Sequence, residues 1–148
     1  MRVLHLIHNL EIGGAQALLR NLVEEQRDSD VDAVVAVWKR GGPILDELRA
    51  VGGKVHVCEP ATSGSLWRTF RWLCALVDTH RPDVVHAHMP DSAFWTGVLS
   101  VAKGLPCVVS YYSNRLLFHT IDPKSVYGRI RWSLVRWGAG RACANVAC

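Results

Sequence analysis

The sequence predicts an α/β protein in three α/β/α layers, with helices on both faces of one doubly wound parallel sheet. Two observations support this prediction. Apolar runs of strand length alternate with segments whose apolar residues recur at helical spacing, and glycine or proline separates most of them. Because neighbouring parallel strands need a crossover connection, this regular alternation is typical of such a sheet.

The first half of the chain is predicted to contain three strands and two helices. Residues 3–8 form an apolar run, and a helix follows from about residue 15 to residue 22. Residues 31–38 form a second run that is rich in β-branched residues. Pro43 stands at a helix start, where its missing N–H costs nothing, and Gly52–Gly53 ends that helix before a short strand at residues 55–58.

The second half of the chain repeats the unit. A loop and cap at residues 62–65 precede a helix, in which four apolar residues recur at helical spacing and are expected to face the sheet: Leu66, Phe70, Leu73 and Val77. The remaining elements are predicted as strand 82–86 with loop 88–91, helix 92–103, strand 105–110, helix 125–137 and strand 144–148. This order describes a Rossmann-like sheet.

Length and composition indicate one globular domain over residues 1–148. The chain has 49% hydrophobic and 20% charged residues, which suits an ordinary globular core. Its five cysteines form no C-x-x-C pair and are interpreted as reduced thiols. We see neither a signal peptide nor an apolar stretch of about eighteen residues, so we expect a cytoplasmic protein, at most peripheral at the inner membrane face.

The sequence lacks the motifs of several enzyme classes. The first turn reads EIGGAQ (residues 11–16) rather than G-x-G-x-x-G, and the second strand ends in Trp38, Lys39 and Arg40 without an acid for a ribose. These features argue against an NAD site. A phosphate-binding G-x-x-x-x-G-K-[ST] loop and a hydrolase G-x-S-x-G turn are also missing.

Basic residues and tryptophans are interleaved in two helical segments. The net charge is +4, and no acid follows Lys124. A peripheral membrane contact is predicted at two sets of residues: Trp67, Arg68, Arg71 and Trp72, and Arg129, Arg131, Trp132 and Arg136. The alternative interpretation is packing of the tryptophans on neighbouring loops for the first set and a solvated helix face for the second. No nucleic-acid motif is present, and we expect no nucleic-acid partner.

Polar residues follow three of the predicted strands. These are Asn9 with Gly13 and Gly14, His86 with His88, and Tyr111 and Tyr112 with Ser113 and Asn114. In a parallel α/β sheet, the carboxyl ends of the strands form the ligand-binding edge. Glycines without a Cβ at a helix N-terminus let a phosphate or sugar approach the backbone amides, although a simple tight turn is the alternative.

The histidine pair allows three interpretations. His86 and His88 point to the same side if the strand continues through them, but a metal would need a third ligand and the sequence offers no convincing one. We therefore expect neither a metal nor a cofactor. A histidine here can instead hydrogen-bond a sugar hydroxyl or a phosphate, or it can be a structural residue that caps the loop.

Three segments together resemble the N-terminal half of a retaining GT-B glycosyltransferase of the group 1, family 4 type. They are residues 3–22 with GGAQ, residues 82–90 (PDVVHAHMP) and residues 104–110 (GLPCVVS). This family transfers sugars from nucleotide donors to lipid-linked, cell-envelope or natural-product acceptors. The resemblance covers nearly the whole chain in the right order.

The resemblance implies roles for individual residues. It implies acceptor binding by this domain, a Gly13–Gly14 loop near the donor phosphates, and His88 and Asp91 at the edge of the cleft. Tyr112 stands where the family often has a histidine. The predicted catalytic residues are thus His88 and Tyr112, and the predicted substrate-binding residues are Asn9, Gly13, Gly14, His86, Asp91 and Asn114.

The resembled enzymes also have a second domain that binds the nucleotide sugar, with two glutamates eight positions apart. No two glutamates here have that spacing. We therefore expect the isolated chain to be inactive and the complete enzyme to need a C-terminal nucleotide-sugar domain. The alternatives are a non-catalytic module that binds a glycan or an anionic surface, and the acceptor subunit of a split glycosyltransferase.

Overall fold

The computed structural model describes residues 1–58, 65–112 and 126–147. Within them, six parallel strands form one sheet in the order β3-β2-β1-β4-β5-β6. The strands are β1 (Arg2–Asn9), β2 (Asp32–Arg40), β3 (Lys54–Val57), β4 (Val84–His88), β5 (Cys107–Tyr111) and β6 (Ala144–Ala147). The order reverses at β1, which confirms the predicted doubly wound α/β sheet.

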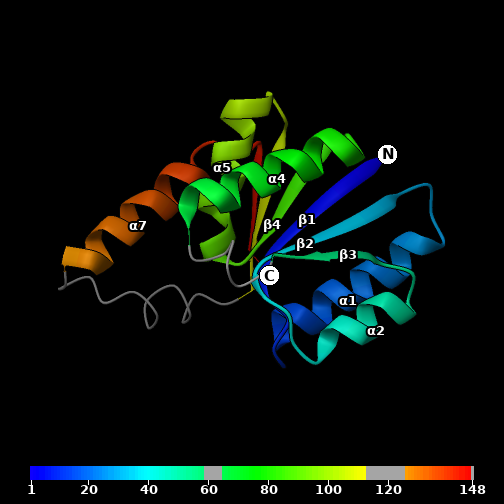
Figure 1. The fold of residues 1–148 in the computed structure, drawn as a ribbon. Helices are drawn as coiled ribbons and strands as arrows, with labels where there is room; N and C mark the ends of the chain where they lie inside the picture. The colour runs from blue at the N-terminus through cyan, green and yellow to red at the C-terminus, as the bar shows by residue number, and fades with distance from the viewer. Residues whose placement is uncertain (59–64, 113–125, 148) are drawn as a thin grey trace.

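Helices cover both faces of the sheet (Figure 1). They are α1 (Gly14–Arg27), α2 (Ile44–Ala50), α4 (Leu66–His80), α5 (Pro90–Lys103) and α7 (Val126–Ala139). Helices α1 and α2 lie on one face, and α4, α5 and α7 lie on the other. Among the described residues, no helix combines the length and the apolar character that a membrane crossing requires.

Alternation along the central strands gives each face its own core. On β1, Leu4 and Leu6 pack against α4 and α5, whereas Ile7 packs against α1 and α2. These three side chains are fully buried. A side chain buried to this extent contributes roughly 1.5–3 kcal/mol of transfer free energy, so the two cores hold β1 firmly in the middle of the sheet.

Helices α5 and α7 cross at two glycines. A Cβ on Gly138 would lie 2.1 Å from the carbonyl oxygen of Ala93, and one on Gly97 would lie 2.6 Å from the Cα of Gly138. Because both obstacles are backbone, neither glycine can be replaced without moving a helix. The two helices therefore pack at a backbone-to-backbone distance.

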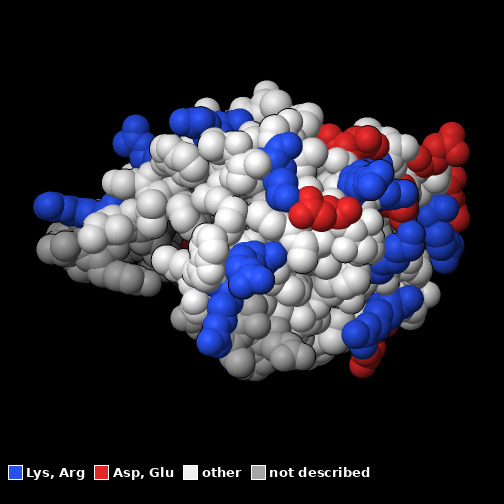
Figure 2. Space-filling model, turned by 45° about the horizontal axis from the view of Figure 1, so that its top comes forward, with Lys and Arg blue, Asp and Glu red and all other residues white. Residues whose placement is uncertain are grey.

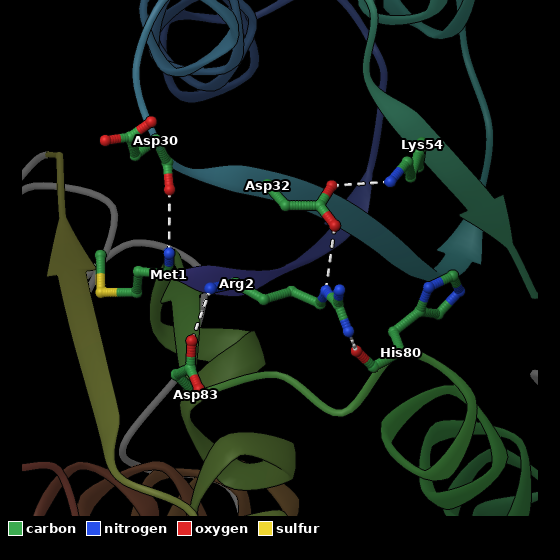
Figure 3. A network of polar contacts seen from close by, with 7 residues as sticks. All are labelled: Met1, Arg2, Asp30, Asp32, Lys54, His80 and Asp83. Carbon is green, nitrogen blue, oxygen red and sulfur yellow. Dashed lines mark hydrogen bonds and ion pairs between the residues drawn. The ribbon is translucent and has the colours of Figure 1, made fainter.

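A polar network ties together the amino ends of β1, β2 and β4 (Figure 3). The Arg2 Nε donates to Asp32 at 2.9 Å, Lys54 Nζ donates to the same carboxylate at 2.7 Å, and the Arg2 amide donates to Asp83 at 2.6 Å. The Lys54 hydrogen bond is the main cause that lowers the pKa of Asp32; burial opposes it, and the Arg2 hydrogen bond lowers the pKa further. This network lies at the sheet edge opposite to the predicted ligand edge.

The structure corrects two predictions. Strand β4 continues through His88, so this histidine belongs to the strand and not to the loop that follows it. On α4, Leu66 is 72% exposed because it lies in the first turn, directly after the Ser65 cap, and Thr69 and Leu76 are buried alongside Leu73 and Val77 instead.

Candidate functional site

The carboxyl ends of β1, β4 and β5 lie side by side. Strands β1 and β4 pair in parallel, with His5 opposite His86, and β4 pairs with β5, with His88 opposite Ser110. The segments that follow these strands therefore leave the sheet at one edge. This edge, hereafter called the rim, brings the glycine loop, the end of β4 and Tyr112 together, as the sequence predicted.

The glycine loop leaves open space beside the start of α1. Gly13 has an extended backbone with φ of −176°, and α1 begins at Gly14 without a side-chain cap. A Cβ on Gly14 would meet no atom of the described residues within 4 Å, whereas one on Gly13 would lie 2.6 Å from Oε1 of Gln16, a buried side chain that donates to Asn9. The turn itself therefore does not require glycine at position 14. The missing side chains leave the helix N-terminus, with its unpaired amides, open to a ligand.

Asn9 supports this loop from inside. Its Oδ1 accepts hydrogen bonds from the Glu11 amide at 3.2 Å and from Gln16 Nε2 at 3.0 Å. Its Nδ2 lies 2.9 Å from the His8 ring. The structure thus gives the predicted ligand-binding Asn9 a role in holding the loop.

Three histidines cluster below the rim, on the face of the sheet that α1 covers. The ring centroids of His86 and His88 are 4.2 Å apart, which confirms that the two side chains share a side, and His5 lies 5.4 Å and 5.1 Å from them. His5 was missed from the sequence because it precedes His88 by 83 residues. The available signal was its position in the first strand, since β1 neighbours β4 in a sheet of this order.

Burial keeps these imidazoles neutral. His5 and His88 are fully buried. Desolvation, followed by the charge of His86, lowers the pKa of His5 to about 4. Desolvation and the two neighbouring histidines lower the pKa of His88 well below its ordinary value, and desolvation lowers that of His86. The neutral forms therefore dominate at pH 7.

The histidine nitrogens make a hydrogen-bonded network. His5 Nε2 lies 2.9 Å from Gln26 Oε1, His5 Nδ1 lies 2.9 Å from His88 Nε2, and His88 Nδ1 lies 2.5 Å from the Tyr112 hydroxyl. His86 Nε2 lies 2.8 Å from Ser110 Oγ. The network thus runs from α1 through two strands to the rim.

The cluster has the composition of a metal site. One nitrogen from each histidine lies within 4.8 Å of the others. However, His5 Nδ1 and His88 Nε2 already share a hydrogen bond, which a metal bound to either of these nitrogens would have to break. We therefore keep the prediction of no metal here, as a prediction that a metal titration can test.

Of this pair, Tyr112 and not His88 is partly exposed. The sequence placed His88 at the edge of the cleft, but its side chain is fully buried, with the Tyr112 ring stacked 5.9 Å away. Met89, which follows, has φ of 74° and ψ of 154°, a conformation that costs a non-glycine residue about 1–3 kcal/mol. Such strain typically occurs at functional sites. Asn114 lies outside the described residues.

A cavity of about 340 Å³ opens beside the rim, on the face covered by α5 and α7. Asp91, in the first turn of α5, and Lys39 contribute its charged groups. The lining consists of Trp38, Lys39, Leu66, Asp91, Phe94, Trp95, Leu134 and Val135. This volume and this mixture of aromatic and polar groups are typical of a small-molecule site.

Comparisons with known proteins agree with this fold. Three crystal structures of Alr3699/HepE from Anabaena superpose on the chain: a complex with UDP-glucose (TM-score 0.65, 15% identity), one with UDP (0.59, 16%) and one with UDP and glucose (0.64, 18%). Each covers 97% of this chain, and this chain spans 43–44% of that protein's length. No curated protein matches.

The sequence itself also matches a family model. The model describes Glycosyltransferase Family 4, and its match extends over residues 12–148, which includes the glycine loop, His86, His88 and Asp91. A match over nearly the whole chain identifies the family independently of the shared fold. The chain therefore belongs to Glycosyltransferase Family 4.

Proposed function

We propose that this chain is the acceptor-binding half of a glycosyltransferase that moves a sugar, of the hexosyl type, from a nucleotide donor to an acceptor hydroxyl with retention. The Anabaena protein of similar fold was crystallised with UDP-glucose, and this chain spans less than half of its length. The donor is accordingly proposed to bind mainly to a C-terminal domain, and the isolated chain is expected to be inactive.

One observation supports this proposal most strongly: the open glycine loop and the aromatic cavity lie at the same edge of the sheet. The loop offers backbone amides to the donor phosphates, because no other described part of the chain occupies the space next to Gly14. The cavity offers the partly exposed Trp38 to the apolar face of an acceptor, and the buried Trp95 supports it with a ring 6.1 Å away. Asp91 then accepts a hydrogen bond from an acceptor hydroxyl.

The test is sugar transfer by the complete protein. It is incubated with a panel of nucleotide sugars and with extracts that contain acceptors, and the release of nucleoside diphosphate is measured. Release that depends on both substrates is expected, and Asp91→Asn should raise the acceptor KM about tenfold while leaving the donor KM unchanged, since one hydrogen bond to a charged group contributes about 1.5–3 kcal/mol. Exposed Glu25→Gln is the matched control.

The outcomes separate the proposals. No release with any donor would refute the enzyme assignment, and glycan binding without release would favour the non-catalytic module. An inverted anomeric configuration in the product, read by NMR, would refute retention alone. Transfer should persist in EDTA because no metal is proposed at the site.

We also propose a peripheral contact with anionic lipid. Trp67 is 66% exposed and lies beside the exposed Arg68 and Arg71, and in Figure 2 the side of the molecule where α7 lies is predominantly basic. The structure removes Trp72 from this surface, because its ring packs against the core. On α7, Arg129 and Arg136 are exposed and Trp132 is partly buried, and the side chain of Arg131 lies outside the description.

A further inference from the structure

A single file of hydrogen bonds connects the end of α1 to the rim. It begins at Gln26 Oε1, passes through His5 and His88, and ends at the Tyr112 hydroxyl, with heavy-atom distances of 2.9, 2.9 and 2.5 Å. Each of the four residues comes from a different segment: α1, β1, β4 and the turn after β5. Since His5 and His88 are fully buried, water does not enter the file between them.

The first member fixes the direction of every bond in the file. An amide oxygen only accepts hydrogen bonds, so His5 Nε2 must have the hydrogen that it donates to Gln26. His5 is neutral at pH 7 because burial lowers its pKa to about 4, and its Nδ1 is therefore a bare acceptor. His88 Nε2 must then donate to it, and, since burial also keeps His88 neutral, its Nδ1 can only accept from Tyr112.

We propose that Gln26 and His5 are positioning residues which, through His88, hold the Tyr112 hydroxyl hydrogen toward the interior. A ligand group that reaches the phenol oxygen then meets a lone pair and not a hydrogen. The phenol selects a ligand group that donates a hydrogen bond, such as a hydroxyl, and it disfavours a phosphate or carboxylate oxygen. This part of the inference rests on the proposed function. It assigns Tyr112 to the acceptor hydroxyl and the glycine loop to the donor phosphates.

The file orients a proton and does not remove it. Moving one proton inward from the acceptor hydroxyl would end with a cationic His5, buried beside two other histidines and, among the described residues, without a carboxylate partner. Such a cation is strongly disfavoured in this surrounding. The geometry thus favours a fixed hydrogen-bond direction over a proton relay.

The first test is independent of any catalytic activity. Nitrogen NMR of the histidine-labelled chain at pH 7 reports which ring nitrogen of each imidazole is protonated. His5 and His88 are expected to be neutral with the hydrogen on Nε2. A hydrogen on Nδ1, or a charged ring, at either residue would overturn the proposal.

The second test removes the first member of the file. In Gln26→Leu, His5 loses the acceptor that fixes its tautomer, so both histidines should show mixed tautomers, whereas the control Glu25→Gln on the exposed side of α1 should match the wild type. Unchanged tautomers in Gln26→Leu would overturn the role of Gln26. The melting temperature checks that each variant is folded.

The third measurement uses the complete protein. In Gln26→Leu, kcat/KM for the acceptor should fall about 2- to 10-fold, as expected for one weakened hydrogen bond, while the donor KM stays unchanged. An equal rise in the donor KM would overturn the assignment of Tyr112 to the acceptor. Loss of all transfer in the wild type would refute the proposed function alone, because the NMR result on hydrogen direction would still stand.

Discussion

Acid should unfold this protein through its buried histidine cluster before its carboxylates are protonated. His5 has a pKa of about 4 in the folded protein, against an ordinary value of 6.5. Between these pH values the unfolded chain binds a proton that the folded chain does not, so stability is lost as the pH falls from 6.5 to 4. At about 1.4 kcal/mol per unit of pKa, His5 alone implies a loss of roughly 3 kcal/mol.

Asp32 affects the stability at lower pH than the histidines do. Its pKa is lowered from an ordinary value of 3.8, mainly by the Lys54 hydrogen bond. The stability that Asp32 contributes is therefore present above pH 3.8 and is lost only below it. His86 and His88 add to the loss of stability that His5 causes above this range, since burial also lowers the pKa of both.

The measurement is urea unfolding of the chain at several pH values from 7.5 to 4.5. The wild type should lose about 2 kcal/mol from His5 alone by pH 5. His5→Leu should lower the stability at pH 7.5, because His88 and Gln26 lose their partner. It should also make the stability depend less steeply on pH, since up to one fewer proton is taken up on unfolding. His56→Gln, on β3, is the control and should keep most of the slope. A flat wild-type profile, or an equal slope in His5→Leu, would refute this reasoning.

Three further predictions concern separate parts of the molecule. Gly14→Ala should have the melting temperature of the wild type but reduce nucleotide release at least about tenfold. Gly42→Ala should instead lose about 1–3 kcal/mol of stability, because its Cβ would lie 2.2 Å from the Leu10 carbonyl oxygen. A lower melting temperature of Gly14→Ala would contradict this prediction. Asp32→Ala should lower the free energy of unfolding, measured in urea, by about 1 kcal/mol. The control Asp46→Ala should lower it by almost nothing, because the ion pair of Asp46 is exposed and 3.7 Å long. Equal losses in the two variants would argue against the network. In flotation with anionic liposomes, binding should weaken when salt is added and in the variant Trp67→Ala. Trp72→Ala should still bind but have a lower melting temperature, because this ring packs against the core. Equal flotation with neutral liposomes would count against the contact.

Much of the fold was predictable because each strand and helix has its own local pattern. Buried strands read as apolar runs, and the strand–helix alternation determines a parallel sheet. The failures occurred where a neighbour in space decided the outcome. Leu66 has the right helical spacing but is exposed in the first turn of α4, and His88 follows a pattern that is equally typical of a loop.

The candidate site was predictable only in outline. Its edge followed from the topology, and Gly13, Gly14 and Tyr112 were found there. The partners of Tyr112 were not, since the contact between His5 and His88 depends on strand register and Gln26 comes from the far end of a helix. The cavity depends on how α7 crosses α5, which no local pattern specifies.

The salt-bridged amino edge of the sheet has a practical consequence for laboratory evolution. Arg2, Asp32 and Lys54 clamp the strands at the end away from the ligand loops. Libraries can therefore randomise the turns at the carboxyl end, where we propose that the acceptor binds, while a tighter clamp at the distant end compensates for the stability that such changes cost. Selectivity and robustness can be optimised in separate rounds.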